Sequence, residues 1–158
     1  MIKLLAILFI FKSLYSEQNT YHFPDQHSRF LHILHQSFKT SSSIVIITPS
    51  FHHSALKKEL QNVSHHGCNV SLYLNNLDGD PLSMVQYQNI NLYHAPLLVN
   101  QTIILVGKSL VCTLSAPIDE ERFSTEQINA QCNDSTDTLR DIQASNQLIL
   151  LHSESYLK

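Results

Sequence analysis

A run of apolar, mostly β-branched residues at positions 44–48 (IVIIT) constrains the fold of this chain most strongly. A continuous apolar run of this length is typical of a buried strand in a parallel sheet. The stretch before it, residues 26–39, spaces its apolar side chains as a helix does, and a second helical stretch runs from Ser54 to Gly67. Residues 69–74 (NVSLYL) are the next expected strand. This alternation predicts an α/β fold, a sandwich in which helices flank a mixed sheet.

The second half of the chain carries shorter signals of secondary structure. A polar pair, Asn100-Gln101, separates two apolar stretches and predicts a hairpin turn. The polar region that follows favours helices, and the apolar run near the end favours a last strand. The expected elements are strands at 90–93, 97–99 and 102–106, helices at 124–132 and 136–145, and a final strand at 147–152.

Residues 1–16 are typical of an export signal or an N-terminal anchor. Lys3 supplies a positive start, residues 4–11 form an unbroken apolar run, and Ser16 is a small residue near a cleavage point. The apolar run is far shorter than the ~20 residues that a membrane-spanning helix needs. An uncleaved anchor and a first β-strand are the other interpretations. We therefore expect residues 17–158 to form one domain that is exported to the periplasm or the cell exterior, with membrane attachment through the N-terminal segment as the alternative.

The charge balance argues against a nucleic-acid-binding protein. The 158 residues hold 10 Lys and Arg and 13 Asp and Glu, a formal net charge of −3 with His neutral. Two of the positive charges, Lys3 and Lys12, belong to the N-terminal segment, so the domain itself is more acidic. Because phosphate backbones attract basic surfaces, nucleic acid is an unlikely partner on net charge.

From Thr20 onward the chain resembles the phospholipase D superfamily, in particular its small, single-motif, exported Nuc-type endonucleases. The resemblance rests on the order of elements and on segments such as SSSIVIITPSF, SNQLILL and HHGCNVSLYL. The last of these is similar to the family's RGV-V-ILD segment. The resemblance covers nearly the whole chain after the N-terminal segment, and it implies a phospholipase D-like sandwich.

The family's chemistry sits in a His-x-Lys-x4-Asp motif that is followed by Gly-Ser-x-Asn. The matching segment here is HAPLLVNQTIILVGKSL, in which His94 falls on the family's His and Gly107 follows thirteen positions later. The other motif positions carry different residues: Pro96 for Lys, Gln101 for Asp, Lys108 for Ser and Leu110 for Asn. The scaffold therefore resembles the family more closely than the motif does.

In the family one His attacks phosphorus and becomes a phosphohistidine, while a second His protonates the leaving oxygen. With one motif per chain, the two His come from two copies, so the resemblance implies a homodimer. Loss of a single preorganised donor to the phosphoryl oxygens costs on the order of a hundredfold in rate. We expect a catalytically impaired protein without cofactor or metal.

Two alternatives to an impaired protein remain at this stage. One is an active, metal-independent phosphodiesterase, a nuclease or phospholipase, with His94 as nucleophile and the Lys108 ammonium as a substitute phosphate contact. The other is a non-enzymatic periplasmic binding or scaffold module. A phosphodiester ligand fits the first alternative and is compatible with the impaired protein as well.

The cysteines and histidines leave further alternatives open. Cys112 and Cys132 can pair and leave Cys68 free, or all three can be small buried residues. The spacing of the cysteines contains no CxxC motif, so it predicts no zinc site. The ten His include three local pairs, which we interpret as a His-rich surface: His32 and His35, His52 and His53, and His65 and His66.

Overall fold

The computed structural model describes residues 18–97 and 99–156 of the chain. The predicted export signal, residues 1–16, lies outside the described residues. Within these ranges, the helices are all too short or too polar to cross a membrane.

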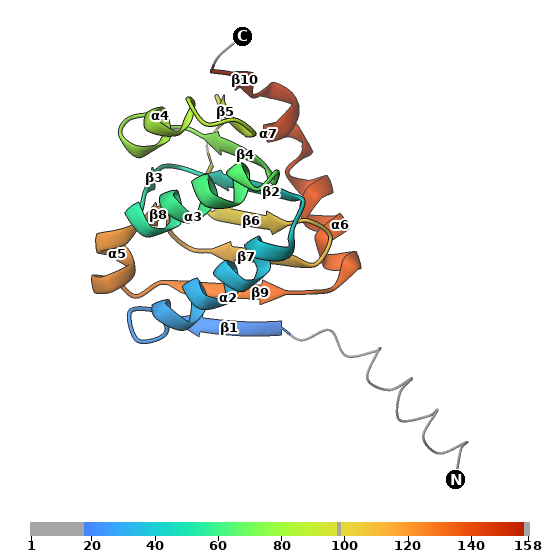
Figure 1. The fold of residues 1–158 in the computed structure, drawn as a ribbon. Coiled ribbons are helices and arrows are strands. Elements are labelled where there is room, and N and C mark those ends of the chain that lie inside the picture. The colour runs from blue at the N-terminus through green and yellow to red at the C-terminus, as the bar shows by residue number, and fades with distance from the viewer. Residues whose placement is uncertain (1–17, 98, 157–158) are drawn as a thin grey trace.

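The described residues form an α/β fold around one mixed sheet of eight strands, as the sequence predicts (Figure 1). The strand order is β1-β9-β7-β6-β2-β4-β5-β10. Strands β2, β4 and β5 are parallel, and the remaining neighbours pair antiparallel. The strands are β1 (Gln18–His22), β2 (Ser43–Thr48), β4 (Asn69–Leu74), β5 (Ile90–His94), β6 (Thr102–Val106), β7 (Leu110–Leu114), β9 (Asn129–Asn133) and β10 (Glu154–Ser155).

One face of the sheet is covered by α2 (His27–Thr40), α3 (Ser54–His65) and the short α4 (Asp80–Met84). Helix α2 turns Phe30, Leu34 and Phe38 toward the sheet, at the i, i+4, i+8 spacing of one helical face. Helix α3 buries Leu56, Leu60 and Val63 in the same way. We call this the first face, and it holds the larger of two apolar cores.

The opposite side of the sheet, which we call the second face, is covered by α6 (Thr136–Ser145) and α7 (Gln147–His152) (Figure 1). Its smaller core joins Ile47, Ile103 and Leu105 of the sheet to Leu139 of α6. A separate corner is built from a two-stranded parallel sheet of β3 (Phe51–His52) and β8 (Ile118–Asp119), followed by α5 (Glu120–Thr125).

The structure corrects the predicted strand at residues 147–152, which is the helix α7. Short apolar runs do not separate strand from helix by periodicity alone. Here three of the four central residues are Leu, a strong helix former, and only Ile149 is β-branched. The run also follows α6 with a break of one residue, Asn146.

The predicted strand at residues 97–99 and its hairpin turn are also wrong. Leu97 and Val99 are not in a strand. The hairpin lies instead between β6 and β7, where Gly107 takes the positive φ of 54° that a tight turn requires. The missed strand β7 begins three residues after this glycine, at Leu110.

The predicted helix at residues 124–132 is only partly present. Helix α5 ends at Thr125, and β9 follows from Asn129 to Asn133. Its burial alternates, with Ala130 and Cys132 buried and Gln131 exposed, which is the period of a strand.

The structure shows which of the cysteines form a disulfide. Cys112 of β7 and Cys132 of β9 lie directly opposite each other in the sheet and form a disulfide. Cys68 is a free, buried thiol. The disulfide therefore fastens two neighbouring strands in the antiparallel half of the sheet.

Candidate functional site

Several strand ends meet at one edge of the sheet. The parallel strands β2, β4 and β5 end at Thr48, Leu74 and His94, which follow one another in register. Because β6 runs antiparallel to β2, its first residue, Thr102, comes to the same edge with its partner Leu114 of β7. We call the edge marked by these five residues the carboxyl edge. In open α/β sheets, ligands bind outside the carboxyl ends of the strands.

The predicted nucleophile, His94, is exposed at the carboxyl edge. It is the last residue of β5, and Glu154 of β10 pairs with it on the side away from β4. The loop that follows is fixed by Asn75, whose side-chain amide donates to the backbone oxygen of Ala95 at 2.7 Å. The backbone N–H of Val99 donates to the Asn75 side-chain oxygen at 2.9 Å. His94 is thus exposed to solvent. The loop that follows it is held by hydrogen bonds to Asn75, the residue just after β4.

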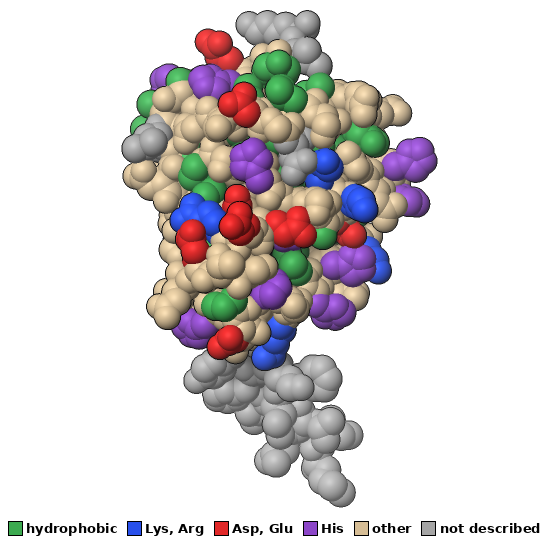
Figure 2. All heavy atoms as spheres, turned by 90° about the vertical axis from the view of Figure 1, so that its left-hand side faces the viewer, with side chains coloured by type: hydrophobic (Ala, Val, Ile, Leu, Met, Phe, Trp, Pro, Cys, Tyr) green, Lys and Arg blue, Asp and Glu red, His purple; other side chains and the backbone are tan. Residues whose placement is uncertain are grey.

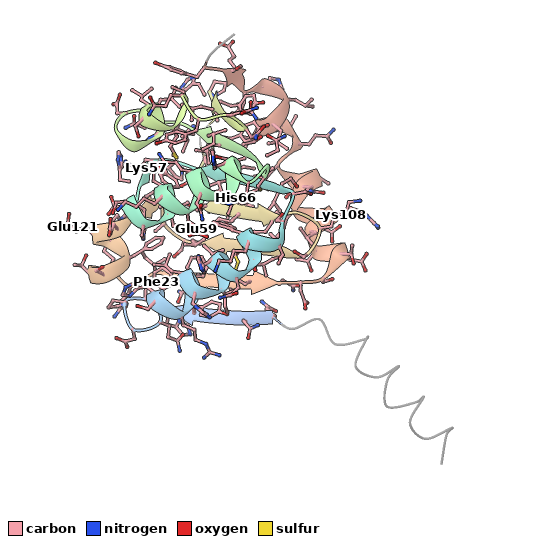
Figure 3. All side chains as sticks on the ribbon, in the orientation of Figure 1. Phe23, Lys57, Glu59, His66, Lys108 and Glu121 are labelled. Carbon is pink, nitrogen blue, oxygen red and sulfur yellow. A yellow bond between two sulfur atoms is a disulfide. The ribbon has the colours of Figure 1, made fainter. Side chains whose placement is uncertain are left out.

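Within one chain, the structure places Lys108, the predicted phosphate contact, away from His94. The backbone N–H of Gly107 donates to the oxygen of Ser43 at 2.8 Å, so the β6–β7 turn lies where β2 begins. His94 lies where β2 ends, at Thr48, and a strand of six residues spans about 16 Å from first to last Cα at ~3.3 Å per residue. Figure 3 shows Lys108 at the far right of the sheet, pointing outward. The two candidate residues therefore occupy opposite edges.

A cavity of about 430 Å³ opens at the carboxyl edge on the second face. It lies between the loop after β5, the start of β6, the end of β7 and the junction of α6 with α7. The hydroxyl oxygen of Ser115 accepts from the backbone N–H of Asn129 at 3.2 Å, and the side-chain amide of Asn146 donates to the oxygen of Ile142 at 2.8 Å. The lining residues are Val99, Asn100, Gln101, Ile103, Ser115, Asn146 and Ile149.

Beneath the carboxyl edge, two threonines form a buried neutral network. The hydroxyl oxygens of Thr48 and Thr102 lie 2.7 Å apart, and both residues are fully buried. The network also reaches the backbone oxygens of Ser50, at 3.0 Å, and Ala116, at 2.7 Å. Because buried polar groups cost free energy unless they are paired, this network stabilises the edge without any charged group.

The corner next to the carboxyl edge contains a buried histidine. His53 is only 3% exposed, packs against Phe123 at 5.3 Å between ring centroids, and accepts the Leu56 backbone N–H at the start of α3. Burial lowers the pKa of His53, against a smaller opposing effect of Glu120. Hydrogen bonds from the Ser54 backbone and hydroxyl lower the pKa of Glu120. These contacts give His53 a structural role, since its Nδ1 caps α3.

Comparison with known proteins places this architecture among solved folds. No protein-family model matches the chain, and no curated protein matches its sequence. NucT from Helicobacter pylori superposes with a TM-score of 0.82 over 90% of this chain and 100% of its own, at 17% identity. Nuc from Salmonella typhimurium, a phospholipase D family member, gives a TM-score of 0.74 over 91% of this chain and 100% of its own, at 15% identity. The chain has the Nuc-type fold of the phospholipase D superfamily.

A more distant neighbour shares the same core. Polyphosphate kinase from Porphyromonas gingivalis gives a TM-score of 0.65 over 84% of this chain but only 26% of its own, at 14% identity. Identities this low establish a fold and carry no residue roles. The function of this chain therefore depends on the residues of its own site.

The Nuc-type fold gives a geometric test of where the expected motif falls. When the segment HAPLLVNQTIILVGKSL is matched to that motif, its Lys position and the Ser position of Gly-Ser-x-Asn are twelve residues apart, and both must reach one phosphate. In the β6–β7 hairpin the residues twelve apart that lie opposite each other are Thr102 and Leu114. A motif counted from this pair would have Asn100 at its His position and Gly107 at its Asp position. Neither this register nor the one that begins at His94 contains a His-x-Lys pair.

The acidic residues of α5, in the corner next to the carboxyl edge, disfavour an anionic ligand. Helix α5 carries Glu120 and Glu121 in its first turn and is capped by Asp119. Figure 2 looks onto the left-hand side of Figure 1, and acidic and His side chains lie together at the centre of this face. Arg122 of α5 is paired with Glu126 at 2.8 Å. The acidic groups on this face disfavour the approach of a phosphodiester, and the Lys and Arg side chains beside them offset part of this effect.

The three His pairs of the sequence have separate surroundings. His35 lies 2.7 Å from the Glu59 carboxylate and joins α2 to α3, while His66 donates to the backbone oxygen of Asn62 at 2.8 Å. Figure 3 labels Glu59 on α3 and His66 just after the end of that helix. Over residues 18–97 and 99–156, His, Cys, Asp and Glu do not gather in any group of three or more suited to a metal ion.

Proposed function

We propose that this Nuc-type chain is an exported, catalytically impaired phospholipase D-like protein that acts as a binding or scaffold module. The observation that supports the proposal is the identity of the residues at the open end of the β6–β7 hairpin, which lies at the carboxyl edge. Asn100 and Thr102 stand there in place of a His and a Lys, and Thr102 is committed to a buried network. Within one chain, His94 and Lys108 lie at opposite edges and are too far apart to act on one phosphorus.

Transfer of a phosphoryl group needs an oriented nucleophile and preorganised donors for the charge that develops on its oxygens. Loss of one such donor lowers the rate about 10²–10³-fold. In this chain the residues at the nucleophile position and at the donor position, Asn100 and Thr102, cannot act as a nucleophile or as a cationic donor. His94 alone has no oriented cation beside it from β6 or β7, so any residual hydrolysis falls by at least about 10⁴.

Hydrolysis of bis(p-nitrophenyl) phosphate and of linear DNA tests this proposal. We expect the wild type, His94→Ala and the control His152→Ala to give the same rate as buffer, with and without EDTA. His152 is a second exposed His, the last residue of α7. A wild-type rate that His94→Ala abolishes and His152→Ala preserves would establish the second candidate, an active phosphodiesterase.

Export is part of the same proposal. The apolar run at residues 4–11 supports it, and so does the Cys112–Cys132 disulfide, since such bonds persist in oxidising compartments. The expected result is a protein found outside the cytoplasm, with one thiol that can be alkylated after unfolding and three after reduction. A cytoplasmic protein with three free thiols would contradict export.

We also propose a homodimer as the working assembly. The exposed leucines of α7, Leu148 and Leu151, support this because they extend an apolar surface beyond the second-face core. Multi-angle light scattering on the purified full chain should give twice the monomer mass. A monomer mass at concentrations of 100 μM or so would contradict it.

A further inference from the structure

We propose that the cavity beside Asn100 binds an uncharged saccharide and not a phosphodiester. This inference rests on the proposed loss of catalysis, because it assigns a new ligand class to the same edge. The cavity occupies the place where the β6–β7 register puts the family's nucleophile. Its volume of about 430 Å³ lies within the range of small-molecule sites.

The polar wall of the cavity is neutral. Asn100, Gln101 and Asn146 bring amide groups to it, and Ser115 brings a hydroxyl. Asn and Gln side chains carry donors and an acceptor, which matches sugar hydroxyls because they also do both. At Asn146 the amide nitrogen is already engaged with Ile142 and Ser145, so Asn100 and Gln101 are the donors that face a sugar. None of the described lining residues is charged. An anion entering this cavity would lose water without gaining a counter-charge, which is costly, whereas a neutral ligand would not.

The remaining wall is apolar. Val99 and Ile103 are buried in the second-face core, and Ile149 of α7 packs against that core from the side. A pyranose ring has one face of C–H groups and a rim of hydroxyls, so it can contact both walls at once. The two walls come from different elements, with the amides on the loop and the α6–α7 junction and the aliphatic side chains on β6 and α7.

The position of the cavity in the sheet separates a saccharide from an extended peptide. Peptides that add to a sheet need a strand edge with unpaired backbone groups. Strand β6, which lines the cavity, is paired on both sides, with β2 and with β7. The backbone there has no free edge, so recognition falls to the side chains.

The test is a titration of the full chain, labelled with ¹⁵N, with N,N′-diacetylchitobiose, maltose and dimethyl phosphate. We expect at least one of the two sugars to shift the amide signals of Asn100, Gln101, Ser115 and Asn146 in a saturable way, and dimethyl phosphate to leave them unchanged. Asn100→Asp keeps the shape but adds a negative charge, and it should weaken sugar binding about fivefold or more. The matched control, Asn19→Asp on the distant strand β1, should leave the affinity unchanged.

Each outcome decides the question. Sugar shifts that are confined to the cavity and weakened by Asn100→Asp alone support the proposal. Absence of shifts with both sugars, shifts elsewhere on the surface, or equal loss of affinity in Asn19→Asp would overturn it. Saturable shifts of the cavity with dimethyl phosphate would overturn it too. The proposed loss of catalysis is judged separately by the hydrolysis assay, so a chain that neither hydrolyses phosphodiesters nor binds sugars fails only this inference.

Discussion

The two faces of the sheet differ in how completely they are covered. On the first face, Phe30, Leu34, Phe38 and Leu60 are fully buried beneath two long helices. On the second face, α7 has no buried residue, and its Leu148 and Leu151 are 63% and 69% exposed. The first face thus has a core that is fully buried, while on the second face part of the apolar surface of α7 is exposed to solvent.

This difference separates what maintains the fold from what is free to change. A fully buried core tolerates little change in volume, because interiors are close-packed. The second face contributes less to the core, and it carries the cavity and the exposed leucines. We therefore expect substitutions on the first face to affect stability and substitutions on the second to affect binding and assembly.

The largest expected effect comes from Phe30→Ala on the first face. Phe30 contacts Tyr21, Phe23 and Phe123 with ring centroids 5.8, 5.4 and 6.4 Å away. Removing the ring leaves a cavity and should lower the free energy of unfolding by about 3–5 kcal/mol in urea denaturation. The second-face control Leu151→Ala should change it by less than about 0.5 kcal/mol. Equal losses in the two variants would remove the distinction between the faces.

Reduction of the Cys112–Cys132 disulfide should have the next largest effect. Both cysteines belong to the first-face core, and the bond closes a loop with a sequence separation of 20 residues. Chain-entropy arguments for a loop of this length predict a loss of about 3 kcal/mol. Urea midpoints with and without reductant measure it, and Cys112→Ala/Cys132→Ala should not respond to reductant. A wild-type urea midpoint that is the same with and without reductant would contradict the prediction.

A smaller effect concerns pH and His53. Because burial holds the pKa of His53 below its ordinary value, the folded chain binds fewer protons than the unfolded chain as the pH falls. Stability is therefore fully present above the ordinary His pKa of about 6.5 and is lost as the pH falls from there toward the lowered value. His53→Asn keeps a capping acceptor but does not titrate, so its urea midpoint should fall less between pH 8 and pH 5.5. His152→Ala, at an exposed His, should retain the wild-type dependence. Identical pH dependence in His53→Asn and the wild type would show that His53 titrates normally.

The smallest effect on stability is expected for Leu148→Ser/Leu151→Ser on α7. Both side chains are exposed, so the free energy of unfolding of the monomer should change by less than about 0.5 kcal/mol. The same variant should convert the proposed dimer into monomers, as measured by light scattering. A variant that stays dimeric would move the interface away from α7.

The two long helices of the first face and strand β2 could be predicted from the sequence because each has a strong apolar pattern. The apolar spacing of α2 and α3 and the β-branched run of β2 agree with their positions in the structure. Helix α7 could not be predicted in this way, since an apolar run of four residues has no measurable period. Strand β9 was missed because its buried residues, Ala130 and Cys132, alternate with polar ones in a stretch that also suits a helix.

The candidate site shows a different limit of sequence reasoning. The separation of His94 and Gly107 fits a linear motif, but residues share a site only where the chain folds back on itself. Recognising Gly107 as the hairpin turn, in place of Asn100-Gln101, would have moved the motif to Asn100 and Thr102. The cavity is harder still, because Asn100 and Asn146 are far apart in the sequence and approach each other only through the packing of α6 and α7.

The Cys112–Cys132 disulfide also determines how the domain would carry a mechanical load. Residues 1–17 attach to Gln18, the first residue of the edge strand β1, whose neighbour in the sheet is β9. If those residues stay in a membrane, tension enters the domain through β1. Strand β1 is held to β9 by hydrogen bonds, whereas β9 is joined to β7 by a covalent bond. Tension would thus first load the β1–β9 hydrogen bonds and next α2, which follows β1 in the chain, while the disulfide would keep β7 and β9 joined.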